Sequence, residues 1–315
     1  MTADSTSGKD EKASVRGFLV LSRLPFLSPG MAALLTGILI AMRMDYGYEP
    51  GLVGISLIGM AFIMLATYYF NEYYDYEGDA INRKFTKLSG GSRAIPDLKV
   101  PRPMARAAGW SAIIVLSAVS ITYLLLYFDD YPLLLPLALF GAFCGVFYSS
   151  PPIQLAYTGI GEVVIGGCYG VLSVVSGFYL VSGELNLDMA VIALPASLTI
   201  FGVIMANEFP DYDADKAVNK RNIVVRLGPA KAALVYAAAM VLAYPMMLAS
   251  MLLDVSVTIV VLGLPVLLLS VFAAVTALRG GHSDSKKQTG MAAATLIANL
   301  LSSLTFILAF PMGVL

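Results

Sequence analysis

Charged residues are scarce in this sequence, and it holds one histidine, two cysteines and one tryptophan in 315 residues. Only 13% of the residues are charged and 58% are apolar, whereas roughly a quarter are charged in an ordinary soluble domain. This balance excludes a soluble enzyme. The single histidine, His282, lies in the polar segment GGHSDSKK, which excludes a His–carboxylate relay or a histidine-rich metal site. Cys144 and Cys168 fall within apolar segments as small hydrophobic residues, so no redox centre is expected.

Long apolar runs make up more than half of the chain. A helix needs about 20 apolar residues to cross the roughly 30 Å hydrocarbon core of a bilayer. Nine such runs lie near 17–42, 51–74, 107–128, 131–149, 159–181, 189–208, 229–252, 255–279 and 289–312. We therefore expect an all-α, polytopic membrane protein with about nine transmembrane helices in one bundle. Residues 1–15 are polar and lack an apolar core, so they predict a disordered tail and no cleaved signal peptide.

Basic residues are unevenly distributed over the connections between these runs. If the N-terminus is cytoplasmic, 19 of the 20 Lys and Arg residues lie on the cytoplasmic side, and only Arg43 lies on the other. Cytoplasmic loops of membrane proteins carry an excess of Lys and Arg. The sequence thus predicts a multi-pass protein of the plasma membrane with a cytoplasmic N-terminus. Its functional polar segments would face the cytoplasm.

Two polar segments on the predicted cytoplasmic side share the pattern N-E-x-x-D-x-x-x-D. They begin at Asn71 and Asn207, 136 residues apart, which indicates that residues 16–315 form a single domain of two related halves. The spacing of four places the Asn and two Asp residues of each pattern along one face, provided that the helix continues through it. The two columns are Asn71, Asp75 and Asp79, and Asn207, Asp211 and Asp215.

These columns offer only oxygen ligands, with no Cys or His nearby. Such a donor set suits Mg²⁺, which keeps several waters and binds through carboxylates and a substrate's phosphates. The alternative is that the carboxylates are ordinary solvated charges at helix ends. Two facing acidic columns repel each other unless cations neutralise them, and carboxylates beside a membrane helix commonly mark function. We therefore predict a metal site.

Basic residues follow each motif closely. Together with metal ions, Lys and Arg form the usual clamp for a diphosphate. The candidates for binding a diphosphate are Arg83, Lys84 and Arg93 after the first motif and Lys216, Lys220 and Arg221 after the second. The stretch Ser-Gly-Gly-Ser-Arg at 89–93 offers backbone N–H groups to the same ligand, although a Gly-Gly pair is often only a flexible turn.

The twin Asp-rich motifs, the nine apolar runs and the segment Y-S-S-P-P at 148–152 resemble the UbiA-type intramembrane prenyltransferases over residues 17–312. The resemblance implies a helical bundle with a central cavity and a diphosphate held by two Mg²⁺ ions between the motifs. It also implies transfer of a polyprenyl group from a polyprenyl diphosphate to an acceptor, usually an aromatic ring. A cytoplasmic site at the end of a membrane bundle suits such a donor, because the apolar tail lies in hydrocarbon and the charged head near water.

Ionisation of the donor leaves an allylic cation that must be kept from water. Tyrosines near the motifs would stabilise this cation with their π faces, although Tyr is also common at membrane interfaces. The candidates are Tyr68, Tyr69, Tyr73, Tyr74 and Tyr148.

Several segments are most similar to the 1,4-dihydroxy-2-naphthoate prenyltransferases of menaquinone synthesis, namely N-E-Y-Y-D-Y, S-G-G-S-R, Y-S-S-P-P and G-I-G-E. One departure is that the connection after Y-S-S-P-P holds no basic residue, whereas many family members have one there. Arg23 or Arg93 would then hold an anionic group of the acceptor, unless the acceptor lacks a carboxylate. Glu162 is the candidate for orienting or deprotonating a ring hydroxyl, or else an ordinary helix-start carboxylate.

Other acceptors stay open, namely 4-hydroxybenzoate, homogentisate or a glycerol-phosphate lipid. A secondary transporter is the alternative from another class, but transporters place broken helices and charges near the midplane. Here both motifs lie at helix ends. The expected partners are the donor, the aromatic acceptor and the lipid bilayer. Neither a nucleic acid nor an obligatory protein partner is predicted.

Overall fold

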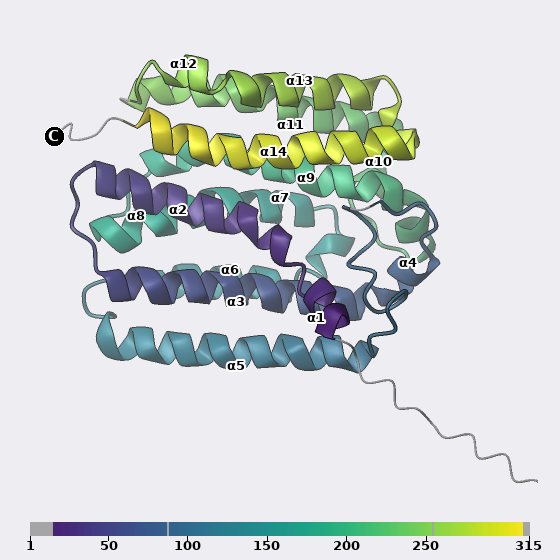
Figure 1. The fold of residues 1–315 in the computed structure, drawn as a ribbon, viewed down its shortest axis with the longest axis horizontal. Coiled ribbons are helices and arrows are strands. Elements are labelled where there is room, and N and C mark those ends of the chain that lie inside the picture. The colour runs from purple at the N-terminus through teal and green to yellow at the C-terminus, as the bar shows by residue number, and fades with distance from the viewer. Residues whose placement is uncertain (1–14, 87, 254, 311–315) are drawn as a thin grey trace, which may run out of the picture.

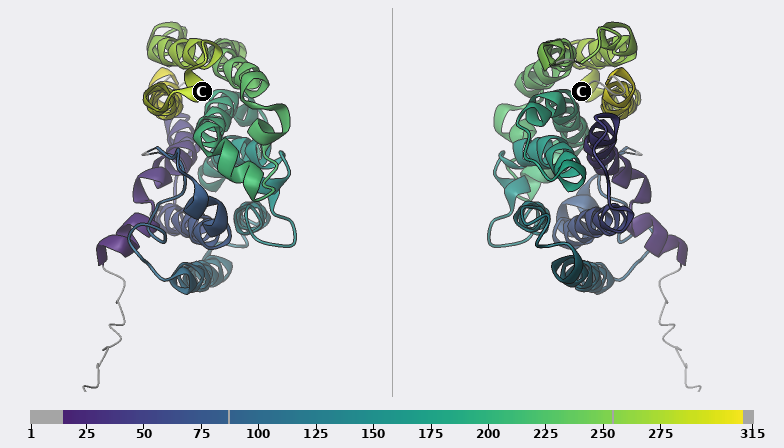
Figure 2. Two further views of the ribbon diagram at one scale, coloured as in Figure 1. Left: turned by 90° about the vertical axis from the view of Figure 1, so that its right-hand side faces the viewer. Right: turned by 90° about the vertical axis from the view of Figure 1, so that its left-hand side faces the viewer.

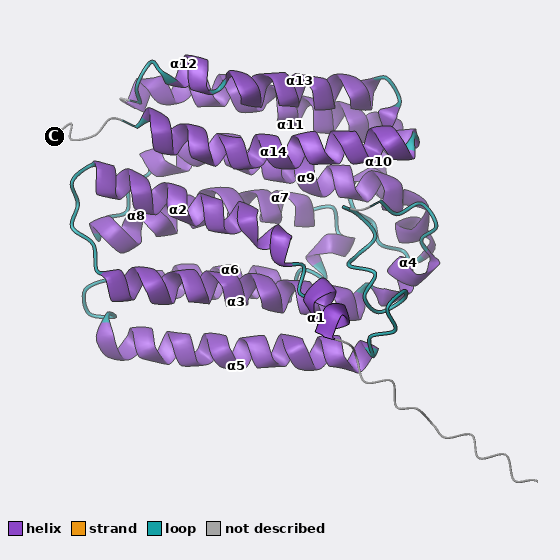
Figure 3. Ribbon diagram, viewed as in Figure 1, coloured by secondary structure: helices purple, strands orange, loops and turns teal. Residues whose placement is uncertain are grey.

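A computed structural model describes residues 15–86, 88–253 and 255–310, and in these ranges the regular structure is helical throughout (Figures 1 and 3). The predicted tail therefore lies outside the described residues, apart from Val15, which begins α1 (Val15–Leu21). The main helices are α2 (Ser28–Arg43), α3 (Pro50–Tyr74), α5 (Arg102–Leu126), α6 (Leu134–Val146), α9 (Asp188–Ala217), α11 (Pro229–Ala249), α13 (Leu264–Leu278) and α14 (Ser285–Ala309). A further span joins α7 (Gly161–Gly166), the π-helical segment η3 (Gly167–Leu172) and α8 (Ser173–Ser182).

Short helices cap or connect these elements. They are η1 (Leu24–Leu27), α4 (Tyr76–Ile81), η2 (Leu155–Tyr157), α10 (Ile223–Leu227), η4 (Ser250–Leu253), α12 (Ile259–Leu262) and η5 (Gly281–Ser283). Prolines stand in the first turns of α3, α11 and α13, where a missing N–H costs nothing because it would have no partner within the helix. These prolines are Pro50, Pro229 and Pro265.

Eight helical spans among the described residues are long and apolar enough to cross a membrane, against about nine predicted. The remaining predicted run, 131–149, corresponds to α6, whose 13 residues extend about 20 Å at 1.5 Å per residue. It still runs the length of the bundle: Tyr131, just before it, accepts a hydrogen bond from Tyr123 at the far end of α5, whereas Ser149, just after it, contacts Asn71 of the first motif. An odd number of passes explains why α1 and the C-terminal end of α14 lie at opposite ends of the bundle (Figure 1).

Two groups of helices are visible when the bundle is viewed from its ends (Figure 2). One group consists of α3 with α5 and α6 packed against it, and the other contains α9, α11, α13 and α14. Between them α2 packs tightly on α8, because Gly37 and Gly177 let the two backbones touch. A Cβ atom built on Gly37 would lie 2.0 Å from the Val174 carbonyl oxygen, and one on Gly177 would lie 2.1 Å from that of Leu34.

The outer surface of the bundle is apolar. Leu125 of α5 is 77% exposed and Leu252 of η4 is 87% exposed. Exposed apolar surface of this extent is stable in lipid and not in water. The protein is therefore a multi-pass membrane protein, as predicted.

Both Asp-rich motifs lie at one end of the bundle, on the right in Figure 1, beside α4 and α10. The second motif is helical throughout, since α9 continues to Ala217. The first motif is not, because α3 ends at Tyr74 and Asp75 is the residue between α3 and α4. The predicted continuous helix through the motif thus exists on α9 only, because the first motif is divided between α3 and α4 at Asp75.

Candidate active site

An acidic cleft lies between the two motifs, with a volume of about 140 Å³. All six predicted metal ligands line it. Its charged and amide lining residues are Asn71, Asp75 and Asp79 from the first motif, Asn207, Glu208, Asp211 and Asp215 from the second, and Arg23 and Lys220. Hydroxyl groups come from Thr67, Tyr68, Ser89, Tyr148 and Tyr169. The prediction that the two motifs face each other across one site agrees with this arrangement.

Asp75 has donors on both of its carboxylate oxygens. Tyr157 donates its hydroxyl to Oδ1 at 3.1 Å, and Asn71 donates Nδ2 to Oδ2 at 2.8 Å. The Lys220 ammonium lies 2.8 Å from the same Oδ2. Asn71 also donates to the Ser149 hydroxyl at 2.7 Å, which ties the Y-S-S-P-P segment to the first motif.

Asp211 and Asp215 of α9 are held by donors from outside their helix. Asp211 accepts from the Asn82 amide at 2.7 Å and from the Gly90 backbone N–H at 3.1 Å. Asp215 accepts from the Asn222 amide at 2.8 Å, and its Oδ1 lies 3.7 Å from Lys220 Nζ. Asn82 and Asn222 were missed by the sequence analysis, although each stands in the basic segment that follows its motif.

The Gly-Gly segment crosses the mouth of the cleft. Gly90 and Gly91 both have positive φ, 76° and 70°, which glycine adopts without strain. A Cβ atom on Gly91 would lie 2.1 Å from Asp79 Oδ2, so only glycine fits against that carboxylate. The N–H of Ser92 donates to Glu72 at 2.6 Å and its hydroxyl donates to the same carboxylate at 2.7 Å. The Gly90 N–H donates to Asp211 and therefore supports the second motif.

Negative charge predominates in the cleft. Five carboxylates line it (Asp75, Asp79, Glu208, Asp211 and Asp215) against two basic side chains, a formal excess of three. Burial, with the neighbouring carboxylates of Glu72, Asp75 and Asp211, raises the pKa of the Asp79 carboxyl well above its ordinary value. An oxygen-only donor set with unbalanced negative charge fits hard divalent cations such as Mg²⁺. Within the described residues, however, no three acidic, His or Cys side chains already converge on one point.

The predicted basic residues divide into three groups. Lys220 and Arg23 line the cleft. Arg93 lies beside it, where its guanidinium donates to the Asp79 backbone carbonyl and pairs with Asp97 at 2.7 Å. The other four candidates are exposed and do not line the cleft: Arg83, Lys84, Lys216 and Arg221. Of these, Lys84 pairs with Asp213 at 2.7 Å on the surface.

Arg23 approaches the cleft from the junction of α1 and η1. Its guanidinium lies 3.6 Å from Glu72 and stacks over the rings of Phe26 and Tyr68 at 4.9 and 5.8 Å. Its Nε is buried and has no hydrogen-bond partner among the described residues. A buried donor of this kind is costly without a partner, so it marks a place for an anionic ligand.

Glu162, the predicted candidate for orienting or deprotonating a ring hydroxyl, is 1% exposed, and its Oε1 accepts the backbone N–H of Ile223 at 2.5 Å, at the start of α10. Its Oε2 is buried and has no hydrogen-bond partner among the described residues. Glu162 does not line the cleft itself. Its contact with Ile223 supports the loop that carries Lys220.

The predicted aromatic residues also divide. Tyr68 and Tyr148 line the cleft, together with Tyr169 of η3, which sequence reasoning missed. The Tyr169 hydroxyl donates to the Tyr68 hydroxyl at 3.3 Å. The others pack in a separate cluster at the α3–α5 contact: Tyr69, Tyr73 and Tyr74.

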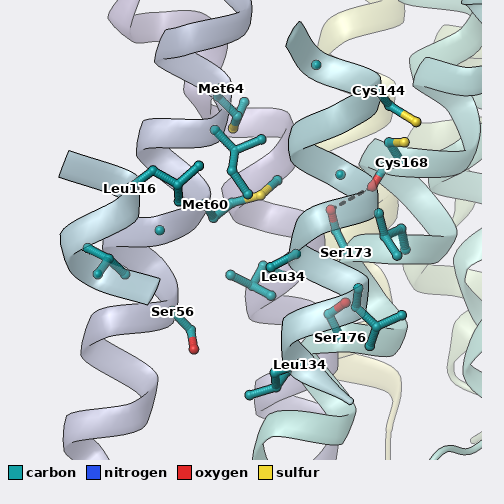
Figure 4. Close-up of a pocket in the computed structure, with 18 of the residues that line it drawn as sticks. Leu34, Ser56, Met60, Met64, Leu116, Leu134, Cys144, Cys168, Ser173 and Ser176 are labelled. Atoms are coloured by element: carbon teal, nitrogen blue, oxygen red, sulfur yellow. Dashed lines mark hydrogen bonds between the residues drawn. The ribbon is translucent and has the colours of Figure 1, made fainter. Parts of the chain in front are cut away.

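The bundle also encloses an apolar cavity of about 140 Å³ (Figure 4). Leu34, Met60, Met64, Leu116 and Leu134 surround it, and both cysteines lie on its wall. Three residues line both spaces, namely Thr67, Ile165 and Tyr169. The acidic cleft and the apolar cavity therefore meet at these side chains.

Fold and site define a class, the helical membrane proteins with an acidic cleft that meets an apolar cavity inside the bundle. The model of the UbiA prenyltransferase family matches residues 30–297, and the chain belongs to that family. It is 25% identical over 188 residues to the 1,4-dihydroxy-2-naphthoate octaprenyltransferase of Bacillus subtilis (strain 168), a match that covers 60% of this chain and 58% of that enzyme.

Two solved structures share the fold. One is described as digeranylgeranylglyceryl phosphate synthase, with a TM-score of 0.60, 19% identity and coverage of 94% of this chain and 98% of that one. The other is a UbiA homolog from Archaeoglobus fulgidus bound to DMAPP and Mg²⁺, with a TM-score of 0.58, 15% identity and coverage of 92% and 99%.

Proposed function

We propose that this protein transfers a polyprenyl group from a polyprenyl diphosphate to 1,4-dihydroxy-2-naphthoate, in a reaction that requires Mg²⁺. The observation that carries the proposal is the junction of the acidic cleft with the apolar cavity at Thr67, Ile165 and Tyr169. A polyprenyl diphosphate has an anionic head and an apolar tail, and this junction accommodates one beside the other. The name of the Bacillus relative and the ligands of the Archaeoglobus homolog support the donor and the metal.

The acidic cleft would accept the diphosphate head of the donor only with divalent cations bound, because its five carboxylates would otherwise repel it. Two Mg²⁺ ions, one for each motif, would be held by Asn71, Asp75 and Asp79 and by Asn207, Asp211 and Asp215. The chemistry that bound Mg²⁺ supplies is neutralisation of the leaving diphosphate. Lys220 contributes a further positive charge inside the cleft.

The tail of the donor occupies the apolar cavity and so places the reacting C1 atom near Tyr169. When the C1–O bond breaks, its electron pair leaves with the diphosphate and C1 becomes an allylic cation. The rings of Tyr68, Tyr148 and Tyr169 line this part of the cleft and stabilise the cation. The surrounding apolar walls exclude water, which would otherwise capture it.

Arg23 is the proposed anchor for the carboxylate of the acceptor. Its buried Nε lacks a partner among the described residues, and a charge-assisted bond to a carboxylate would satisfy it. The ring carbon that bears the carboxyl group attacks C1 and forms the new C–C bond. Loss of CO₂ returns an electron pair to the ring and restores its aromaticity, so no separate ring proton has to be removed.

The active cleft is proposed to face the cytoplasm of the plasma membrane. The basic residues that predict this orientation lie mainly at the motif end of the bundle, and Arg43 lies at the other end, where it donates to the Phe310 carbonyl at 2.8 Å. The positive-inside rule then assigns the motif end to the cytoplasm.

The test is an assay of the purified protein with one labelled polyprenyl diphosphate and a panel of acceptors, with product masses measured. We expect a product from the naphthoate that is lighter by CO₂ than the simple adduct. A product that keeps its carboxyl group, or transfer only to 4-hydroxybenzoate, homogentisate or a glycerol-phosphate lipid, would refute the naphthoate assignment. The fold shared with digeranylgeranylglyceryl phosphate synthase makes the glycerol-phosphate lipid the principal second candidate. Absence of transfer to every acceptor would refute the proposal.

A further inference from the structure

Lys220 lies between the two motifs and contacts both of them. Its ammonium lies 2.8 Å from Asp75 of the first motif and 3.7 Å from Asp215 of the second. The side chain is 17% exposed, and these two carboxylates are 7% and 8% exposed. One buried cation therefore bridges two acidic segments that are far apart in sequence.

The loop after α9 holds this lysine firmly. The Lys220 backbone N–H donates to the Asp215 carbonyl at 2.8 Å, and Asn219 before it adopts a left-handed conformation with φ of 59°. Asn222 donates to the Asp215 carboxylate at 2.8 Å and accepts the Val225 N–H at 2.8 Å. The loop thus wraps around Asp215 and directs the lysine side chain into the cleft.

Three of the four motif aspartates already have protein partners on both carboxylate oxygens. The partners of Asp75 are Asn71, Tyr157 and Lys220. The other two aspartates with partners on both oxygens are Asp211 and Asp215. Among these partners Lys220 is the only full positive charge that the described residues place between the motifs. A divalent cation that binds Asp75 or Asp215 through the oxygen facing Lys220 has to displace the ammonium.

We infer that Lys220 is an internal counter-ion that holds the two motifs together and competes with metal ions for Asp75 and Asp215 until a diphosphate arrives. The inference rests on the proposed function, because it takes Mg²⁺ and a diphosphate as the ligands. A metal ion alone would leave the displaced ammonium buried without a partner, which is unfavourable. A diphosphate supplies oxygens for that ammonium, so metal and diphosphate binding support each other.

The substitution Lys220→Met separates this role from a purely structural one. Binding of Mn²⁺ without diphosphate, followed by the electron paramagnetic resonance signal of free Mn²⁺, should become about tenfold tighter, within the usual range of coupling between two sites. Binding of labelled inorganic diphosphate at saturating Mg²⁺ should become weaker by a similar factor. Tighter binding of Mn²⁺ together with weaker binding of diphosphate would identify the counter-ion role of Lys220, because a general distortion of the cleft weakens both affinities.

Lys220→Arg should keep both affinities near those of the wild type, since it retains the charge, and Lys220→Gln replaces Lys220→Met if the latter does not fold. Lys286→Met, which removes an exposed lysine at the start of α14, is the matched control and should change neither affinity. Unchanged or weaker Mn²⁺ binding in both neutral Lys220 variants would overturn the inference. These readouts need no prenyl acceptor, so failure of the transfer assay with the expected changes in affinity would count against the proposed function alone.

Discussion

The four motif aspartates carry most of the proposed chemistry. Asp75→Ala, Asp79→Ala, Asp211→Ala and Asp215→Ala should each lower turnover by about 100-fold or more, because each removes a charge that helps bind the metal ions and thus neutralise the leaving diphosphate. EDTA should abolish turnover reversibly. Initial rates of the purified variants in Mg²⁺, with membrane insertion checked in parallel, provide the measurement.

Asp213 offers a matched control for these substitutions. It belongs to the same segment, but its side chain is 63% exposed and pairs with Lys84 on the surface. Asp213→Ala should therefore retain near wild-type turnover. If two of the four motif variants kept near wild-type rates in Mg²⁺, the metal site would be wrong.

A substitution of Arg23 distinguishes acceptors that carry a carboxylate from those that do not. Arg23→Met should raise KM for the naphthoate by about tenfold or more, because a charge-assisted hydrogen bond contributes roughly 1.5–3 kcal/mol. The dependence of initial rate on acceptor concentration gives this value. Arg16→Met, an exposed residue of α1, should leave KM unchanged. A KM that stays constant in Arg23→Met would remove Arg23 from the acceptor site.

At the scale of elements, the segment 89–92 joins the two motifs at the mouth of the cleft. It contacts Asp211 through Gly90 and Glu72 through Ser92, and Gly91 lies against Asp79. Gly91→Ala would place a Cβ atom 2.1 Å from Asp79 Oδ2 in a backbone with φ of 70°. We expect turnover to fall at least tenfold, because a shift of about 1 Å in a catalytic group is enough for a large loss.

Gly183→Ala is the control for backbone strain alone. Gly183 has a φ of 73°, but a Cβ atom there meets nothing within 4 Å. Turnover of Gly183→Ala should remain near that of the wild type when Gly183→Ala and Gly91→Ala are assayed at equal protein content. Equal losses in the two variants would mean that backbone strain, and not the contact with Asp79, explains the effect of Gly91→Ala.

At the scale of the whole molecule, the orientation in the membrane decides which compartment supplies the substrates. Asp129 follows the C-terminal end of α5 and Ser285 begins α14, and both residues are exposed. These two helix ends lie at opposite ends of the bundle (Figure 1). A membrane-impermeant maleimide applied to intact cells should label Asp129→Cys and leave Ser285→Cys unlabelled until the membrane is opened. The parent chain, which has only Cys144 and Cys168, gives the background. The reverse labelling pattern would place the cleft on the outer face.

The membrane spans and the residue types of the site follow from the amino-acid sequence alone. Apolar runs long enough to cross a bilayer and the repeated N-E-x-x-D-x-x-x-D pattern are local features, so they predict the helical bundle and the six oxygen ligands without knowledge of packing. The short span α6 and the bend at Asp75 departed from the prediction, because local hydrophobicity does not specify where a helix ends within a run.

Only the tertiary structure decided which residues join the motifs in the cleft. Seven basic candidates look alike in sequence, yet Lys220 and Arg23 line the cleft and four others are exposed. The contact of Glu162 with the Ile223 N–H at the start of α10 is likewise visible only in the tertiary structure. The physical reason is that these contacts connect positions such as 75 and 220, and their geometry depends on how α3 and α9 pack, which no local pattern encodes.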